Sequence, residues 1–276
     1  MNPLVTIIMS THNAEGYIDE CLQSIAAQSY SDFTVYMIDD ASTDSTAEKV
    51  KEFIKNDERF QLIDIHKQNR GLTPTLNELW KMAETKYVAR MDADDVMHEE
   101  RLEKQVQLLE KHKGLDVVGS YAMNINKDSE PIDIRKVPVY HKDVKKTLPL
   151  ASPVIHPSAM IRRSALETVG GYNETYPVAQ DYDLWFRLMG NGSGFHNIPE
   201  TLLYYRMEAH HVKKRNIRHR WLDAKTRWRG TKLIGSTGRT KLVSLTVSAV
   251  MLGMPSFLKP TMMKLKEHID PRYSKF

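Results

Sequence analysis

The sequence predicts an α/β fold built on a Rossmann-like, mostly parallel sheet with helices on both faces. Short segments rich in Val, Ile, Tyr and Phe alternate with stretches of helical periodicity in the first half of the chain. This order is typical of strand–helix–strand units, which place ligand sites at the carboxyl ends of parallel strands. A length of 276 residues and an apolar content of 41% allow a substantial core.

The expected elements follow from these segments in order. Strands are expected at residues 4–9, 33–38, 61–65 and 87–91. Helices are expected at residues 14–28, with Asn13 as N-cap, and at 44–56, 73–84 and 98–112. A further strand is expected at 116–124, after which prolines loosen the pattern. Neither a G-x-G-x-x-G fingerprint nor a P-loop occurs, so a bound nucleotide would be held differently.

The cysteine content and the N-terminus indicate a cytoplasmic setting. The single cysteine, Cys21, lies on the apolar side of the first expected helix, and one cysteine excludes an intramolecular disulfide. The first residues enter a strand without a basic, then apolar, secretory leader. We therefore expect a protein of the reducing cytoplasm.

The charge divides the chain into two expected regions, 1–211 and 212–276. The first region has 23 Lys and Arg against 32 Asp and Glu, whereas the second has 16 against 3. Within the second, residues 242–258 form a run of 17 uncharged residues, which is shorter than a membrane span of about 20 residues. We interpret 212–276 as a basic, amphipathic helical tail that associates with an anionic membrane surface.

Two alternatives for the tail stay open, namely packing on the main domain and packing on a second subunit of a homo-oligomer. Nucleic acid is the least favoured partner, because the acidic first region would repel phosphate backbones.

Polar residues follow three of the expected strands and should meet at one edge of the sheet. They are residues 10–13, residues 39–44 and the acidic segment Asp92-Ala93-Asp94-Asp95. Residues two apart in an extended chain point the same way, so Asp92 and Asp94 can face one pocket. Hard oxygen ligands of this kind suit Mg²⁺ or Mn²⁺. The alternative is a solvated turn in which Asp94 or Asp95 caps the helix at 98–112.

Taken with residues 69–71 and the segment 180–185, these motifs make the chain resemble the family 2 glycosyltransferases. These are inverting enzymes of the GT-A fold, and the resemblance covers residues 4–206. Within this family, the chain resembles the bacterial enzymes of surface polysaccharide synthesis. The resemblance implies a nucleotide-sugar donor, most simply a UDP-sugar, and a divalent cation, Mn²⁺ or Mg²⁺.

The resemblance also implies roles on the donor side. Thr11 and Asp39 are expected at the uracil edge, where a carboxylate would accept from a ring N–H. Arg70 is expected over the base or at the phosphates. Asp92 is expected at the ribose, and Asp94 is expected as a metal ligand that bridges to the diphosphate.

For two aspartates expected on the donor side, two interpretations stay open. Asp40 either contacts the nucleotide or caps the turn at residues 42–44. Asp95 either serves as a second metal ligand or caps the following helix.

On the acceptor side, the resemblance implies that Asp181 is the catalytic base. Burial would raise the pKa of Asp181, whereas the N-terminus of a helix would lower it, and the sequence leaves the balance open. Gln180 departs from the glutamate that is usual before this base. His156 and Arg206 are weaker expectations for binding the acceptor or a phosphate, and a structural role for His156 is an equal alternative.

Together these features predict a metal-dependent inverting glycosyltransferase on the inner face of the cell membrane, acting on a saccharide or lipid-linked saccharide. Two rival classes remain. A sugar-phosphate nucleotidyltransferase shares the sheet and the acidic ligands, but it would need a Gly-rich basic loop after the first strand. A binding protein without activity is suggested by Gln180.

Overall fold

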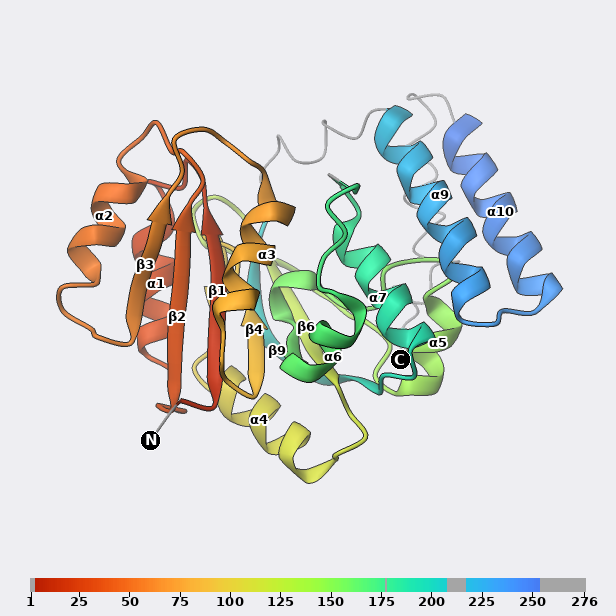
Figure 1. Cartoon of the computed structure of the whole chain (residues 1–276), viewed down its shortest axis with the longest axis horizontal. Coiled ribbons are helices and arrows are strands. Elements are labelled where there is room, and N and C mark those ends of the chain that lie inside the picture. The colour runs from red at the N-terminus through yellow and green to blue at the C-terminus, as the bar shows by residue number, and fades with distance from the viewer. Residues whose placement is uncertain (1–2, 177, 208–216, 254–276) are drawn as a thin grey trace.

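The computed structural model describes residues 3–176, 178–207 and 217–253 (Figure 1). Within these residues the centre of the molecule is a nine-stranded sheet with the principal order β3-β2-β1-β4-β8-β6-β9-β5. The first half of this order is parallel, as expected. It comprises β1 (Val5–Thr11), β2 (Phe33–Asp39), β3 (Phe60–Ile65) and β4 (Tyr87–Arg90).

The second half of the sheet is mixed, so the expectation of a mostly parallel sheet holds only for the first half. β8 (Met160–Arg162) runs antiparallel to β4 and to β6 (Val117–Ile125). β9 (Phe195–Arg206) pairs parallel with β6 and antiparallel with β5 (Val96–Met97). β7 (Pro131–Arg135) is paired antiparallel with β6. Of these strands, β6 was expected at 116–124. β7, β8 and β9 follow residue 125, where the sequence pattern is loosened, and β5 has only two residues, so a periodicity analysis did not find them.

Helices cover both faces of the sheet, as expected. Successive residues of β1 point to opposite faces, with Ile7 in one core cluster and Ile8 in the other. The first cluster is completed by α1 (Ile18–Ala26), α2 (Thr46–Phe53) and α4 (Arg101–Lys111). The second is completed by α3 (Leu72–Met82), α5 (His141–Thr147), α6 (Arg163–Val169) and α7 (Gln180–Gly190).

Two expected helix caps are wrong. The first helix begins at Ile18, and Asn13 instead adopts φ +50° and accepts a hydrogen bond from the Thr43 backbone N–H at 2.8 Å. The fourth helix begins at Arg101 after Glu100, so neither Asp94 nor Asp95 caps it. Asn13 serves a neighbouring loop instead, and Asp95 Oδ1 accepts from the backbone N–H of Arg206 at the end of β9.

In its described residues, 217–253, the tail forms two helices, α9 (Ile217–Leu233) and α10 (Gly238–Gly253), which lie side by side at one end of the molecule (Figure 1). Gly230 of α9 faces Phe186 of α7, and a Cβ at Gly230 would come within 2.1 Å of that ring. Ser244 of α10 donates a hydrogen bond to the Pro149 carbonyl at 2.8 Å. Packing on the main domain, one of the two open alternatives, is therefore observed.

None of the helices within the described residues is long and apolar enough to span a membrane. The end of the expected apolar run, residues 254–258, and the basic residues after it lie outside the described residues.

Candidate active site

A cavity of about 680 Å³ opens at the carboxyl ends of β1, β2 and β4. Its wall contains residues that are far apart in the chain but were expected in one site, namely Asp40, Asp92, Asp94, His156 and Asp181. The acidic segment and the expected base thus face the same space.

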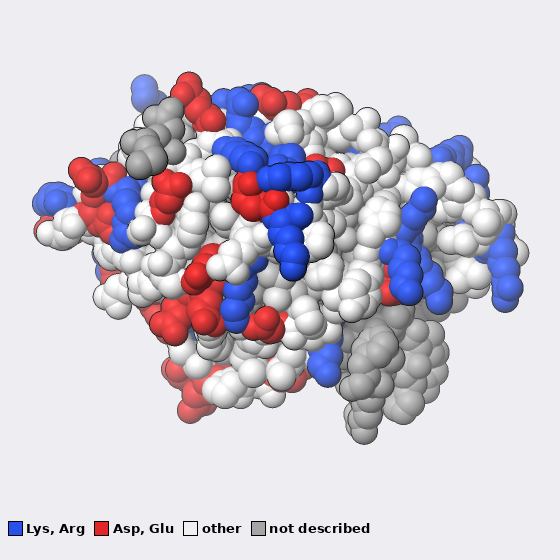
Figure 2. Space-filling view, turned by 90° about the horizontal axis from the view of Figure 1, so that it is seen from below, with Lys and Arg blue, Asp and Glu red and all other residues white. Residues whose placement is uncertain are grey.

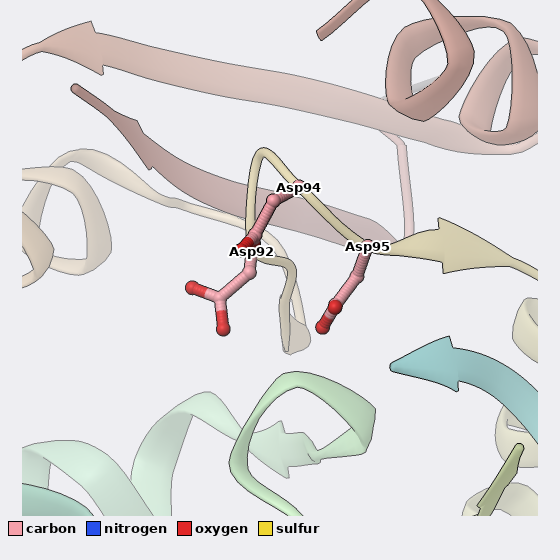
Figure 3. Close-up of side chains that lie close together, drawn as sticks. All are labelled: Asp92, Asp94 and Asp95. Carbon is pink, nitrogen blue, oxygen red and sulfur yellow. The ribbon is translucent and has the colours of Figure 1, made fainter. Parts of the chain in front are cut away.

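The acidic segment lies in the connection from β4 to β5 and brings three carboxylates together (Figure 3). One oxygen each from Asp92, Asp94 and Asp95 falls within 4.8 Å of the others. Asp95 is buried, and its Oδ2 has no hydrogen-bond partner within the described residues. Burial, followed by the charges of Asp92 and Asp94, raises the pKa of Asp95 well above its usual value. A cluster of this composition fits a hard divalent cation.

Arg206 holds this acidic segment from behind and does not lie in the cavity wall. Its backbone N–H donates to Asp95 Oδ1 at 2.8 Å, and its Nε donates to the Asp94 carbonyl at 2.7 Å. Its Nη2 donates to Glu20 at 2.6 Å, and its Nη1 donates to the Asn126 carbonyl at 2.9 Å. The structure thus gives Arg206 protein partners where the sequence led us to expect acceptor or phosphate contact.

Arg90 is a residue of the site that sequence reasoning missed. It ends β4, is buried, lines the cavity and forms an ion pair with Asp92. Its Nε and Nη1 have no hydrogen-bond partner within the described residues. The available signal was an arginine inside an otherwise apolar strand, because a buried cation needs a charged partner.

Asp181 lies in the first turn of α7 and in the cavity wall. Burial raises its pKa, the backbone N–H of Tyr182 and the charge of Arg90 lower it, and Asp223 of α9 raises it. The net shift is upward, which resolves the balance that the sequence left open. Asp183 has another role, because its Oδ2 accepts a 2.6 Å hydrogen bond from Arg187 Nε.

Thr11 and Asp39 meet at the ends of β1 and β2, where they are paired in register. Thr11 Oγ1 donates to Asp39 Oδ2 at 2.9 Å, and Asp39 also accepts from the backbone N–H and the hydroxyl of Ser42 at 2.8 and 2.6 Å. Both side chains are fully buried beside the cavity and are not part of its wall. Asp39, and not Asp40, therefore holds the turn that begins at Ser42.

Asp40 instead organises the segment 69–71. Its Oδ1 accepts from the Arg70 backbone N–H at 2.8 Å, and its Oδ2 accepts from the Gly71 N–H at 2.7 Å. Gly71 needs the freedom of glycine here, because its φ is +89°. The guanidinium of Arg70 pairs with Glu78 at 2.6 Å, and Arg70 itself is not in the cavity wall.

His156 is a buried histidine whose edge reaches the cavity. Its Nε2 lies 2.8 Å from the Tyr172 hydroxyl, and its ring meets Trp185 edge-on. Burial and the charge of Arg90 lower its pKa well below the usual value, so the imidazole is neutral. The structural interpretation of His156 accounts for these contacts.

Residues 6–170 match the family model described as "Glycosyl transferase family 2". The chain belongs to this family and is a glycosyltransferase. An uncharacterised glycosyltransferase of Haemophilus influenzae is 36% identical over 75% of this chain and 66% of its own length. The O-antigen biosynthesis glycosyltransferase WbnJ of Escherichia coli is 29% identical over 76% of this chain and 82% of its own length.

Solved structures show the same GT-A fold. S. aureus TarS, in complex with UDP-GlcNAc, superposes with a TM-score of 0.69 at 18% identity, over 96% of this chain and 80% of that one. The mannosyltransferase PcManGT of Pyrobaculum calidifontis, in complex with GDP-Man and Mn²⁺, gives 0.63 at 18% identity, over 96% and 81%.

Proposed function

We propose that this protein is a metal-dependent inverting glycosyltransferase that moves a sugar from a UDP-sugar to a saccharide or lipid-linked saccharide. One observation carries the proposal: Asp92 and Asp94 of the acidic cluster and the separate carboxyl group of Asp181 line a single cavity, with Asp95 buried next to them. A single-displacement transfer needs this pairing, with charge stabilisation at the leaving group and a base at the nucleophile.

The acidic cluster is the proposed metal site, with Asp94 as the principal ligand and Asp95 as the second. Asp92 is the proposed ribose contact, held by Arg90. A Mn²⁺ or Mg²⁺ ion bound there would neutralise charge on the departing diphosphate. The Mn²⁺ of the structural neighbour PcManGT supports this assignment.

Asp181 is the proposed base. As the acceptor oxygen bonds to the anomeric carbon, the bond from that carbon to the diphosphate oxygen breaks, and the acceptor proton passes to Asp181. A partly desolvated carboxylate with a raised pKa is a stronger base than an exposed one. Inversion follows because the acceptor attacks from the side opposite the leaving group.

The nucleotide end of the cavity is proposed at the segments around residues 12–14 and 69–72, which both lie in its wall. Thr11 and Asp39 remain the proposed partners of the uracil edge, and a direct contact requires their mutual hydrogen bond to open. Arg70 remains a proposed phosphate contact once its pair with Glu78 is exchanged. The UDP-GlcNAc bound by TarS is the support for a UDP donor.

The acceptor class and the cellular site are proposed from the tail and the relatives. In α10 the small polar side chains of Ser244 and Ser248 face inward, whereas Leu242 and Val243 are 65% and 44% exposed. On α9 the exposed Trp228 has Lys232 over its ring. Exposed apolar and cationic groups together suit an anionic lipid surface. We therefore propose attachment to the cytoplasmic face of the membrane and a lipid-linked acceptor, as the O-antigen role in the name of WbnJ also suggests.

The test of the reaction is UDP release from a panel of UDP-sugars with Mn²⁺ and a saccharide acceptor. Asp181→Asn is expected to lower kcat by about 10²- to 10⁴-fold, the usual contribution of a general base. Binding of the donor without turnover in the unaltered protein would instead identify a binding protein.

Membrane attachment is tested by flotation with vesicles that contain anionic lipid. We expect association at low salt that weakens at high salt. Absence of association at low salt would contradict the membrane proposal and leave the tail as a packing element alone.

A further inference from the structure

His66 lies behind the cavity, immediately after β3, and has both ring nitrogens against carboxylates. Its Nδ1 is 2.7 Å from Asp40 Oδ1, and its Nε2 is 2.9 Å from Glu78 Oε2. Its side chain is only 3% exposed. An ionised carboxylate only accepts hydrogen bonds, so both ring nitrogens must donate, and only the imidazolium can do so.

The surroundings of His66 favour this charged form. Burial would lower the pKa of His66, but the hydrogen bonds and charges of Asp40 and Glu78 raise it above its usual value. The described groups that face the ring are Asp40 at the end of β2, Glu78 on α3 and Arg70, whose Nη1 is 3.5 Å from Nε2. The cation of Arg70 is itself paired with Glu78 at 2.6 Å.

His66 contacts Asp40, and Asp40 in turn holds part of the cavity wall. Asp40 uses its two oxygens to fix the backbone N–H groups of Arg70 and Gly71, and its carbonyl accepts from Asn69 Nδ2 at 3.3 Å. Asp40, Asn69 and Gly71 all line the cavity. Glu78 belongs to α3, the helix that begins just after Gly71. His66 thus joins the end of β2 to the helix on the other side of the 69–71 segment.

We propose that His66 is a positioning residue for donor binding, whose imidazolium ties Asp40 to Glu78 and so fixes the 69–71 segment at the nucleotide end of the cavity. The inference rests on the proposed function, because the ligand at this end is the nucleotide-sugar. When His66 loses its proton, one ring nitrogen presents a lone pair to a carboxylate, and the hydrogen bond between these two groups is lost. Donor affinity should therefore fall as the pH rises through the pKa of His66, while kcat should be little affected.

The experiment measures the Kd of UDP-GlcNAc in the presence of Mn²⁺ by calorimetry between pH 6.0 and 8.5. This probe has no group of its own that ionises in that window. For the unaltered protein we expect binding to weaken by about tenfold across the range, the equivalent of one lost hydrogen bond. His66→Phe should bind weakly at every pH.

Glu78→Gln is the matched variant. The Gln amide can donate to the Nε2 of a neutral imidazole while its oxygen still accepts from Arg70. The hydrogen-bonded link from Asp40 through His66 to residue 78 therefore persists when His66 is neutral. We expect Glu78→Gln to bind as tightly as the unaltered protein does at pH 6.0, and to lose the pH dependence. A flat Kd in the unaltered protein, or an unchanged pH dependence in Glu78→Gln, would overturn the inference.

A second readout separates this inference from the proposed donor. Amide hydrogen exchange of Arg70 and Gly71, measured without ligand, should lose protection above the pKa of His66 in the unaltered protein and keep it in Glu78→Gln. Failure to bind UDP-GlcNAc at any pH would contradict the UDP donor, and the exchange data then decide the role of His66. Protection that does not depend on pH would reject that role even if the donor binds.

Discussion

The parallel and mixed halves of the sheet build the cavity in different ways. In the parallel half, neighbouring strands end at one level, so Thr11 and Asp39 meet in register and the acidic segment follows β4 at the same edge. In the mixed half, Asp181 lies on α7, which follows the short elements β8 and α6 in the chain. Arg206, at the end of β9, donates hydrogen bonds to Asp94 and Asp95. The first half is organised by strand periodicity and the second by contacts between distant segments.

The two halves are therefore expected to respond differently to mutation. A change of Asp94 at the edge of the parallel half should remove a proposed metal ligand. A change of Arg206 in the mixed half should instead displace the acidic segment while its carboxylates stay chemically intact. Figure 2 shows acidic side chains gathered with basic ones over the left part of the face seen from below, whereas the right-hand end carries mainly basic side chains, so the two ends also differ in surface charge on that side.

After the loss of the proposed base in Asp181→Asn, the largest effect is expected at the edge of the parallel half. Asp94→Asn should lower kcat/KM by about 10²- to 10³-fold, because it removes charge from the group proposed to stabilise the leaving diphosphate. The measurement is UDP release as a function of Mn²⁺ concentration. Asp128→Asn, in an exposed turn where Asp128 pairs with Lys127, is the control and should keep wild-type activity. An Asp94→Asn enzyme with the wild-type Mn²⁺ dependence would show that the ion is held elsewhere.

The next effect tests the contact that joins the two halves. Arg206→Lys keeps the charge but loses the planar guanidinium group, whose nitrogens donate hydrogen bonds to Asp94, Glu20 and Asn126. We expect Mn²⁺ affinity to fall about 10- to 100-fold, as for other residues that orient metal ligands. Arg163→Lys, a surface pair with Glu167, serves as the control. If Arg206→Lys leaves Mn²⁺ affinity intact, the acidic segment does not need the mixed half.

A smaller effect concerns the pH dependence. The proposed base, Asp181, must be ionised to act, so kcat/KM should decline as the pH falls through its raised pKa. Arg90 lowers that pKa, and Arg90→Met should therefore move the acidic limb upward, by on the order of one pH unit. Arg90→Lys should restore most of the limb. An acidic limb that stays in place in Arg90→Met would remove Arg90 from the electrostatics of the base.

The smallest effect on activity is expected in the tail. Gly230→Ala places a methyl group against the Phe186 ring and should cost about 1–3 kcal/mol where α9 packs on α7. The measurement is thermal unfolding. Gly238→Ala, where an added Cβ meets nothing within 4 Å, should leave Tm unchanged. Equal Tm values for the two variants would show that α9 contributes little to the stability of the mixed half.

The sequence by itself determined the strand–helix order, the position of the acidic segment and the glycosyltransferase family. Periodicity located β1 to β4 to within two residues, because their side chains are buried on a regular pattern. The order of the motifs then identified the family, although each motif alone was a weak signal.

Only the tertiary structure decided what each polar side chain contacts. Asn13 holds a loop and caps no helix, Asp39 holds the turn that one of the two interpretations gave to Asp40, and Arg206 holds the acidic segment. It also showed that burial outweighs the helix N-terminus at Asp181, and that His66 bridges two carboxylates. The physical reason is that hydrogen bonds and desolvation depend on groups far away in the chain, whereas periodicity reports only which side of a strand or helix is buried.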